Sequence, residues 1–161
     1  MPLGFATKRF TLTIKQKNEQ AAFIRFAERL GQRMNWYEVL SRPEPEPDLL
    51  CAHDQLGPIA FELVSLTDPE IAKRQAVGSH AYSTAFSTCD PSERIIRNKL
   101  HKSYATTASH IELLIYTDGQ IITPDDLIIS NIQPWFDAID HQFQRIWFMG
   151  EKKTSCLWTV V

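Results

Sequence analysis

Hydrophobic residues gather in seven short segments of the chain, where they alternate with polar residues or form continuous apolar runs. Both patterns are typical of β-strands that are buried on one or both faces. The predicted strands cover residues 8–15, 36–40, 48–53, 59–65, 110–116, 143–149 and 156–161. Asp54 and Gly57 lie between the third and fourth segments, so we expect a turn that joins these two strands as a hairpin.

Three longer segments space their hydrophobic residues as an amphipathic helix does. The predicted helices cover residues 18–30, 92–104 and 125–141. Asn18 is a typical N-cap for the first helix, and Gly31 suits its C-terminal end. Pro134 disturbs the third helix, because proline has no N–H to donate. Between the second predicted helix and the strands before it, the pattern indicates a short helix near Thr67 and a loop over 78–89.

The order of these elements predicts the fold class. One helix is followed by three strands, and helices then alternate with the remaining strands. This order indicates an α/β fold, or an α+β fold, with a mixed central sheet flanked by helices. A chain of 161 residues is long enough to bury a sizeable core as one domain, so we expect a single domain over residues 1–161.

Composition limits the classes of function. The chain is 43% hydrophobic and 22% charged, as is ordinary for a globular protein, and its net charge of −2 gives no overall basic field. This charge argues against a high-affinity DNA-binding protein, although it allows an enzyme with a local basic groove. Cys51, Cys89 and Cys156 form no CxxC pair, which favours a reducing, cytoplasmic location. We expect no signal peptide and no membrane span. P-loop, GxSxG and GxGxxG motifs are absent from the sequence.

Two acidic residues occupy costly positions. Asp48 follows Pro47 at the start of one apolar run, and Glu62 interrupts another. A buried ionised carboxylate costs several kcal/mol unless it is paired or binds a metal. If the hairpin places His53 opposite Gly57, Asp48 lies opposite Glu62 and both point to one face. A shift of one residue in this register would separate them.

The aspartate after proline, the glutamate in the next strand and the order of the surrounding elements resemble the PD-(D/E)xK, or restriction-endonuclease-like, nuclease superfamily. The resemblance covers about residues 16–116. It implies an α-β-β-β-α-β core and Mg²⁺- or Mn²⁺-dependent hydrolysis of DNA phosphodiester bonds, by an endonuclease or an exonuclease. By this resemblance, Asp48, Glu62 and the Leu63 carbonyl would bind the metal. Val64 stands at the position of the lysine.

Some members of that superfamily supply the lysine from the following helix, where Lys99 and Lys102 are available. A helical projection places Lys99 nearer to the apolar stripe than Lys102, although both could simply extend into solvent from the edge of an amphipathic helix. The superfamily often adds a glutamate from the first helix. Glu19 falls inside the apolar stripe there and Glu28 lies opposite, but an acid early in a helix is also favoured by the helix dipole.

Other functions remain open. With Val64 at the lysine position, the chain could be a catalytically inactive member of the same fold that acts as a binding or interaction module. It could also be an unrelated α/β protein in which Asp48 and Glu62 point apart. Aromatic residues crowd the C-terminal third and could form either a homodimer interface or a well-filled core. They are Trp135, Phe136, Phe143, Trp147, Phe148 and Trp158.

Overall fold

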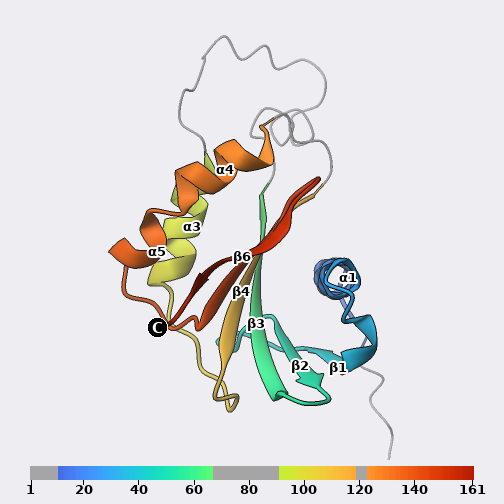
Figure 1. Cartoon of the computed structure of the whole chain (residues 1–161). Helices are drawn as coiled ribbons and strands as arrows, with labels where there is room; N and C mark the ends of the chain where they lie inside the picture. Colours follow the sequence, from blue (N-terminus) through green and yellow to red (C-terminus); the bar gives the residue numbers. More distant parts are fainter. Residues whose placement is uncertain (1–10, 67–90, 119–122) are drawn as a thin grey trace, which may run out of the picture.

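The computed structural model describes residues 11–66, 91–118 and 123–161, and this part of the chain forms a mixed β-sheet with helices on both faces (Figure 1). The α/β class is therefore confirmed. The helices are α1 (Ile14–Arg29), α3 (Pro91–His101), α4 (Asp125–Ile132) and α5 (Trp135–Ala138), with a short 3₁₀ turn η1 (Arg33–Asn35). The strands are β1 (Trp36–Ser41), β2 (Leu49–His53), β3 (Gly57–Leu66), β4 (Ile111–Thr117), β5 (Arg145–Met149) and β6 (Thr154–Thr159). The predicted short helix near Thr67 and the loop over 78–89 lie outside the described residues.

The six strands are hydrogen-bonded in sequence order, from β1 to β6. β1, β2 and β3 form an antiparallel meander, β3, β4 and β5 run parallel, and β6 returns antiparallel to β5. In the β2–β3 hairpin, His53 faces Gly57 and Leu49 faces Phe61, so the predicted register is confirmed. Pairing with β2 stops at Phe61, whereas β3 continues to Leu66.

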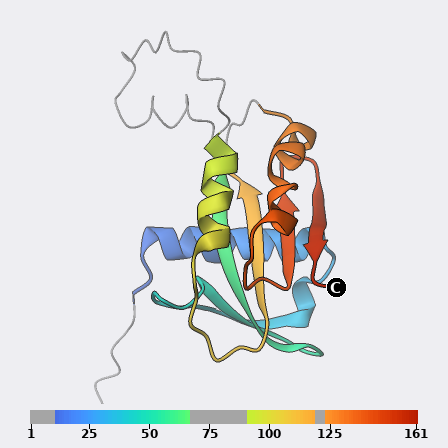
Figure 2. The ribbon, with the colours of Figure 1, turned by 90° about the vertical axis from the view of Figure 1, so that its left-hand side faces the viewer.

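Each face of the sheet has its own hydrophobic core. Figure 2 shows α3, α4 and α5 in front of the sheet and α1 crossing behind it. On the α1 face, Phe23 packs against Phe61 and Trp36, with ring centroids 4.9 and 5.1 Å apart. On the other face, Ile96 and Leu100 of α3 meet the alternate residues of β3 and β4. The sheet is thus buried on both faces, as its continuous apolar runs predict.

The crowded aromatic residues of the C-terminal third contribute to both cores. Phe136, Phe143 and Phe148 are buried on the α3 face. Trp147 packs on the opposite face, where its ring lies 5.2 Å from that of Phe26. These four residues therefore fill the interior of one chain, and a homodimer interface through them stays an untested prediction.

The N-terminal prediction is wrong at one point. Helix α1 begins at Ile14 rather than after Asn18, so residues 11–15, the described part of the predicted first strand, form no strand: 11–13 precede the helix and 14–15 belong to it. Thr13 and Gln16 form a capping box, in which each side chain accepts a hydrogen bond from the backbone N–H of the other residue. This local signal outweighs the alternation of Leu12 and Ile14 with polar residues. Glu19 consequently lies in the second turn, beyond the strongest influence of the helix dipole.

Two other helix boundaries differ from the prediction. The segment 125–141 divides into α4 and α5 at Pro134, which lies between them. α3 ends at His101 and leaves Tyr104 outside the helix, because the backbone of Tyr104 is hydrogen-bonded to the Gln142 side chain. No helix within the described ranges is long and apolar enough to cross a membrane.

Candidate functional site

Asp48 and Glu62 meet where β2 separates from β3. Asp48 directly precedes β2, and its backbone N–H donates to Oε2 of Glu62 at 3.2 Å. Oδ2 of Asp48 accepts from the N–H of Leu63 at 2.9 Å. Only 2% of Glu62 is exposed. The confirmed register thus brings the two predicted acids together, and backbone groups fix both carboxylates.

Lys99 reaches the same point from α3. Its Nζ lies 2.6 Å from Oε1 of Glu62, with about a quarter of the lysine side chain still exposed. Lys102 instead points to Glu44, at 3.4 Å, and over the ring of Tyr104. The predicted ranking of the two lysines is therefore confirmed. Val64, at the expected lysine position, is buried in the core beneath α3 and supplies no cation.

Glu19 approaches from α1, and only 7% of this residue is exposed. Burial, followed by the charge of Asp48 and a side-chain hydrogen bond with Asp48, raises the pKa of Glu19 from its ordinary 4.5 to about 7. Burial and the Asp48 charge also raise the pKa of Glu62, and Lys99 opposes this shift without cancelling it. Burial and the nearby Asp48 charge thus disfavour the ionised forms of Glu19 and Glu62, and the Lys99 ammonium only partly offsets this effect at Glu62.

A groove of about 480 Å³ opens beside this cluster, between α1, β3 and α3. Glu19 and Asn18 line one side, Lys99 lines the other, and Leu63–Ser65 form part of its floor. The groove lies along the part of β3 that continues beyond its pairing with β2. A ligand in it would contact both Glu19 and Lys99.

The predicted metal site has a limited ligand set. In the described portions of the chain, no three or more His, Cys, Asp or Glu side chains are grouped so that they could hold a metal ion. The predicted set consists of two carboxylates, from Asp48 and Glu62, together with the main-chain carbonyl of Leu63. A metal bound there would need further oxygen ligands from water or substrate, as Mg²⁺ usually has.

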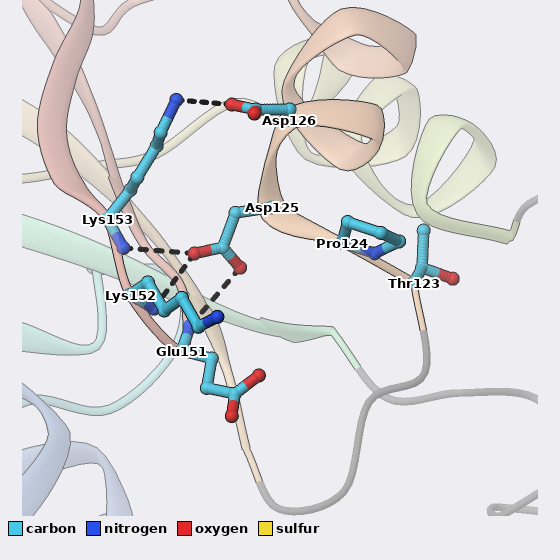
Figure 3. A pocket seen from close by; sticks show the side chains of 7 residues that line it. All are labelled: Thr123, Pro124, Asp125, Asp126, Glu151, Lys152 and Lys153. Carbon is cyan, nitrogen blue, oxygen red and sulfur yellow. Dashed lines mark hydrogen bonds and ion pairs between the residues drawn. The ribbon is translucent and has the colours of Figure 1, made fainter.

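A second pocket, of about 350 Å³, surrounds Asp125 at the start of α4 (Figure 3). The Asp125 carboxylate accepts backbone N–H groups from Glu151 at 3.2 Å and from Lys152 and Lys153 at 2.9 Å each. Burial opposes the charge of Asp125, but these hydrogen bonds outweigh it and hold its pKa below 3.8. A Cβ atom on Gly150 would clash with the Asp125 carboxylate, so this contact also requires glycine. These hydrogen bonds clamp the start of α4 to the β5–β6 turn, so we interpret the pocket as a structural contact.

The sequence interpretation missed a third buried acid, Glu112 of β4. It is 2% exposed and accepts a hydrogen bond from Trp147 Nε1 at 2.7 Å, with His110 Nε2 at 3.5 Å. Burial raises the pKa of Glu112, and the Trp147 hydrogen bond opposes that shift. A glutamate inside the strand run IELLIY was the available signal. Glu112 faces the α1 side, opposite to Glu62, and therefore belongs to a separate structural pair.

Comparisons with models of known protein families, with curated proteins and with solved structures give no match to this chain.

Proposed function

We propose that this protein is a metal-dependent nuclease of the PD-(D/E)xK type, which hydrolyses DNA phosphodiester bonds with a lysine supplied by α3. The contact between Lys99 Nζ and Glu62 Oε1, beside Asp48, is the observation that carries this proposal. It brings the two motif acids and a cationic side chain together although Val64 occupies the usual lysine position. The order α1, β1, β2, β3, α3, β4 in the described residues further supports a restriction-endonuclease-like core.

The chemistry of the cluster fits a divalent cation. Mg²⁺ and Mn²⁺ prefer hard oxygen ligands, which the carboxylates of Asp48 and Glu62 and the Leu63 carbonyl would provide. Burial, followed by the Asp48 charge, raises the pKa values of Glu19 and Glu62, so a cation bound beside them would stabilise their ionised forms. When bound, such a cation lowers the pKa of a water molecule and neutralises charge on a phosphodiester oxygen.

The side chains around the groove have separate roles in this proposal. Lys99 would orient the attacking water and offset phosphate charge, since its ammonium is a compact cation at the edge of the groove. Glu19, with a pKa of about 7, exchanges a proton near neutral pH and would lose it as a cation binds nearby. Exposed cations of α3, including Arg94 and Arg97, would border the DNA backbone.

A plasmid-nicking assay in Mg²⁺ or Mn²⁺ tests the proposal with Lys99→Met and its matched control, Lys102→Met. Loss of a group that orients or deprotonates water costs about 10²–10⁴-fold in rate. We therefore expect Lys99→Met to lower the cleavage rate at least about 100-fold. Lys102 contacts Glu44 on the surface, so Lys102→Met should retain most of the activity.

Equal activity of wild type and Lys99→Met would contradict the proposed role of Lys99 and indicate a contaminant or a different site. An inactive wild type would contradict the nuclease proposal. If that inactive wild type still bound the cation, the alternative of an inactive binding module of the same fold would be favoured.

A further inference from the structure

Two lysines line the groove from opposite sides. Lys99 reaches it from α3 and Lys15 from the first turn of α1, and they are the cations among the described residues that line it. Lys99 Nζ is held by Glu62 Oε1 at 2.6 Å, whereas the Lys15 side chain is 78% exposed and its Nζ lies 3.8 Å from Glu19 Oε1. Lys15 is therefore the more loosely held of the two cations, and its side chain is able to turn toward a ligand.

The stability of α1 does not explain a lysine at position 15. The positive end of the helix dipole lies at the N-terminus, where it favours acidic residues and opposes cations. The first turn of α1 is described throughout, and it contains Lys15 and Lys17 but no acidic residue. A lysine four residues before a glutamate is also the less favourable order for an ion pair within a helix. Lys15 thus contributes little to α1 as a structural residue.

The negative charge around the groove gives a cation at this position a use. Glu19 and Asp118 line the groove, and Asp48 and Glu62 lie beside Glu19. These acids suit a metal ion, but they repel the charged phosphates of a DNA strand on either side of the phosphodiester that the metal would neutralise. Lys15, one helical turn before Glu19 on the same side of the groove, offsets this repulsion.

The place of the groove in the fold also suits a ligand. β3 and β4 run parallel, and Ser65 and Tyr116, near their carboxyl ends, line the groove together with the first turns of α1. In open α/β sheets, ligands bind in crevices outside the carboxyl ends of the strands. The partial positive charge at the start of α1 adds to that of Lys15 and favours an anion there.

We infer that Lys15 is a further substrate-binding residue of this site, whose ammonium contacts a backbone phosphate of the DNA strand next to the phosphodiester bound beside Lys99. This inference rests on the proposed function, because it requires a DNA strand in the groove. Lysine binds phosphate as a point charge, so the contact supplies affinity without a preference for any base.

Fluorescence anisotropy with a short labelled oligodeoxythymidylate in Mg²⁺ tests this contact. Phosphorothioate linkages keep the charge of the strand and slow its hydrolysis during the measurement. We expect Lys15→Gln to weaken binding about 5-fold at low salt. The slope of log affinity against log salt concentration should become shallower by about 0.7, the value of one phosphate contact on a single strand. Lys15→Arg keeps the charge and should retain both the affinity and the slope.

Lys17→Gln is the matched control. Lys17 is exposed in the same turn of α1 and is not among the described residues that line the groove, so the variant removes the same charge without removing the contact. We expect it to keep the wild-type affinity and slope. An equal change in Lys15→Gln and Lys17→Gln would show an effect of overall charge and would overturn the inference.

Two further measurements test whether Lys15 acts indirectly. Calorimetric titration with Mg²⁺ alone should give the same affinity for Lys15→Gln as for wild type. Thermal unfolding should show the variant melting at the wild-type temperature or slightly above it, because the change removes a cation from the positive end of the helix dipole. Lost Mg²⁺ binding would assign Lys15 to the acidic cluster, and a lower melting temperature would assign it to the stability of α1. Either result would overturn the inference.

The outcomes separate this inference from the proposed function. If wild type binds Mg²⁺ and cleaves DNA, and Lys15→Gln binds the oligonucleotide with the wild-type affinity and slope, the inference alone fails. If wild type binds neither Mg²⁺ nor the oligonucleotide, the proposed function fails, and the inference fails with it.

Discussion

Two regions of this protein shift the pKa values of their carboxyl groups in opposite directions. At the start of α4, Asp125 receives three backbone N–H groups from the β5–β6 turn, and its pKa is held below the ordinary value. Beside β3, Glu19 and Glu62 share a buried cluster with Asp48, and their pKa values are raised. The first region favours the charged carboxylate, and the second region opposes it.

This difference separates an acid that stabilises the fold, Asp125, from acids that are available to bind a ligand or take part in catalysis. Asp125 has its charge satisfied, so a ligand would have to displace three hydrogen bonds to use it. Glu62 has one ammonium partner and little solvent around it, while Asp48 adds a second charge close by. Uncompensated charge in a buried site is costly for stability, and sites that retain it are candidates for function. The groove beside Glu19 and Lys99 is therefore the better candidate for an active site than the Asp125 pocket in Figure 3.

The largest expected effect on stability comes from breaking the clamp at α4. Asp125→Ala leaves three N–H groups without their acceptor, and we expect it to cost ~1–2 kcal/mol, comparable to the loss of a helix cap. Differential scanning calorimetry at pH 7 should show a melting temperature lower by roughly 3–8 °C. Asp126→Ala is the matched control, because its exposed ion pair with Lys153 contributes little.

The same pair of variants tests the direction of the pH dependence. The folded-state pKa of Asp125 is depressed, so its stabilisation is present above the ordinary value of 3.8 and is lost as pH falls through the lower folded value. The difference between wild type and Asp125→Ala should therefore shrink in strong acid. A difference that stayed constant from neutral pH to strong acid would contradict the assignment.

A smaller effect of opposite sign is expected at Glu19. Its folded-state pKa of about 7 exceeds the ordinary 4.5, so its ionisation destabilises the fold as pH rises through that window. Glu19→Gln should raise the melting temperature by roughly 2–4 °C at pH 8 and leave it unchanged near pH 4.5. Glu28→Gln, on the exposed side of α1, should have no effect at either pH. A destabilised Glu19→Gln at pH 8 would remove the distinction between the two acidic regions.

The sequence was sufficient to predict those features of the fold and site that depend on a local turn or on the periodicity of a helix. The turn through Asp54 and Gly57 sets the hairpin register, which in turn places Asp48 opposite Glu62. Helical periodicity alone ranks Lys99 above Lys102 as the lysine that faces the sheet. These are the elements on which the candidate site depends, and they could be predicted before any coordinates.

Long-range contacts determine what the sequence could not predict. The N–H groups that bind Asp125 come from a turn 26–28 residues later, and no sequence pattern near Asp125 predicts this contact. The end of α3 and the placement of Tyr104 depend on Gln142, 38 residues away. The start of α1 is an exception, because the Thr13–Gln16 capping box is local and was outweighed in the prediction by the alternating residues before it.

The central claim is that the cluster beside β3 binds a divalent cation, and calorimetric titration with Mn²⁺ tests it most directly. Wild type should bind Mn²⁺, and Glu62→Gln should lose that binding. Glu112→Gln is the matched control, because it changes an equally buried glutamate in the adjacent strand on the opposite face. Retained binding in Glu112→Gln together with its loss in Glu62→Gln is the predicted result. Absence of metal-dependent heat from wild type, or equal binding by all three proteins, would contradict the account.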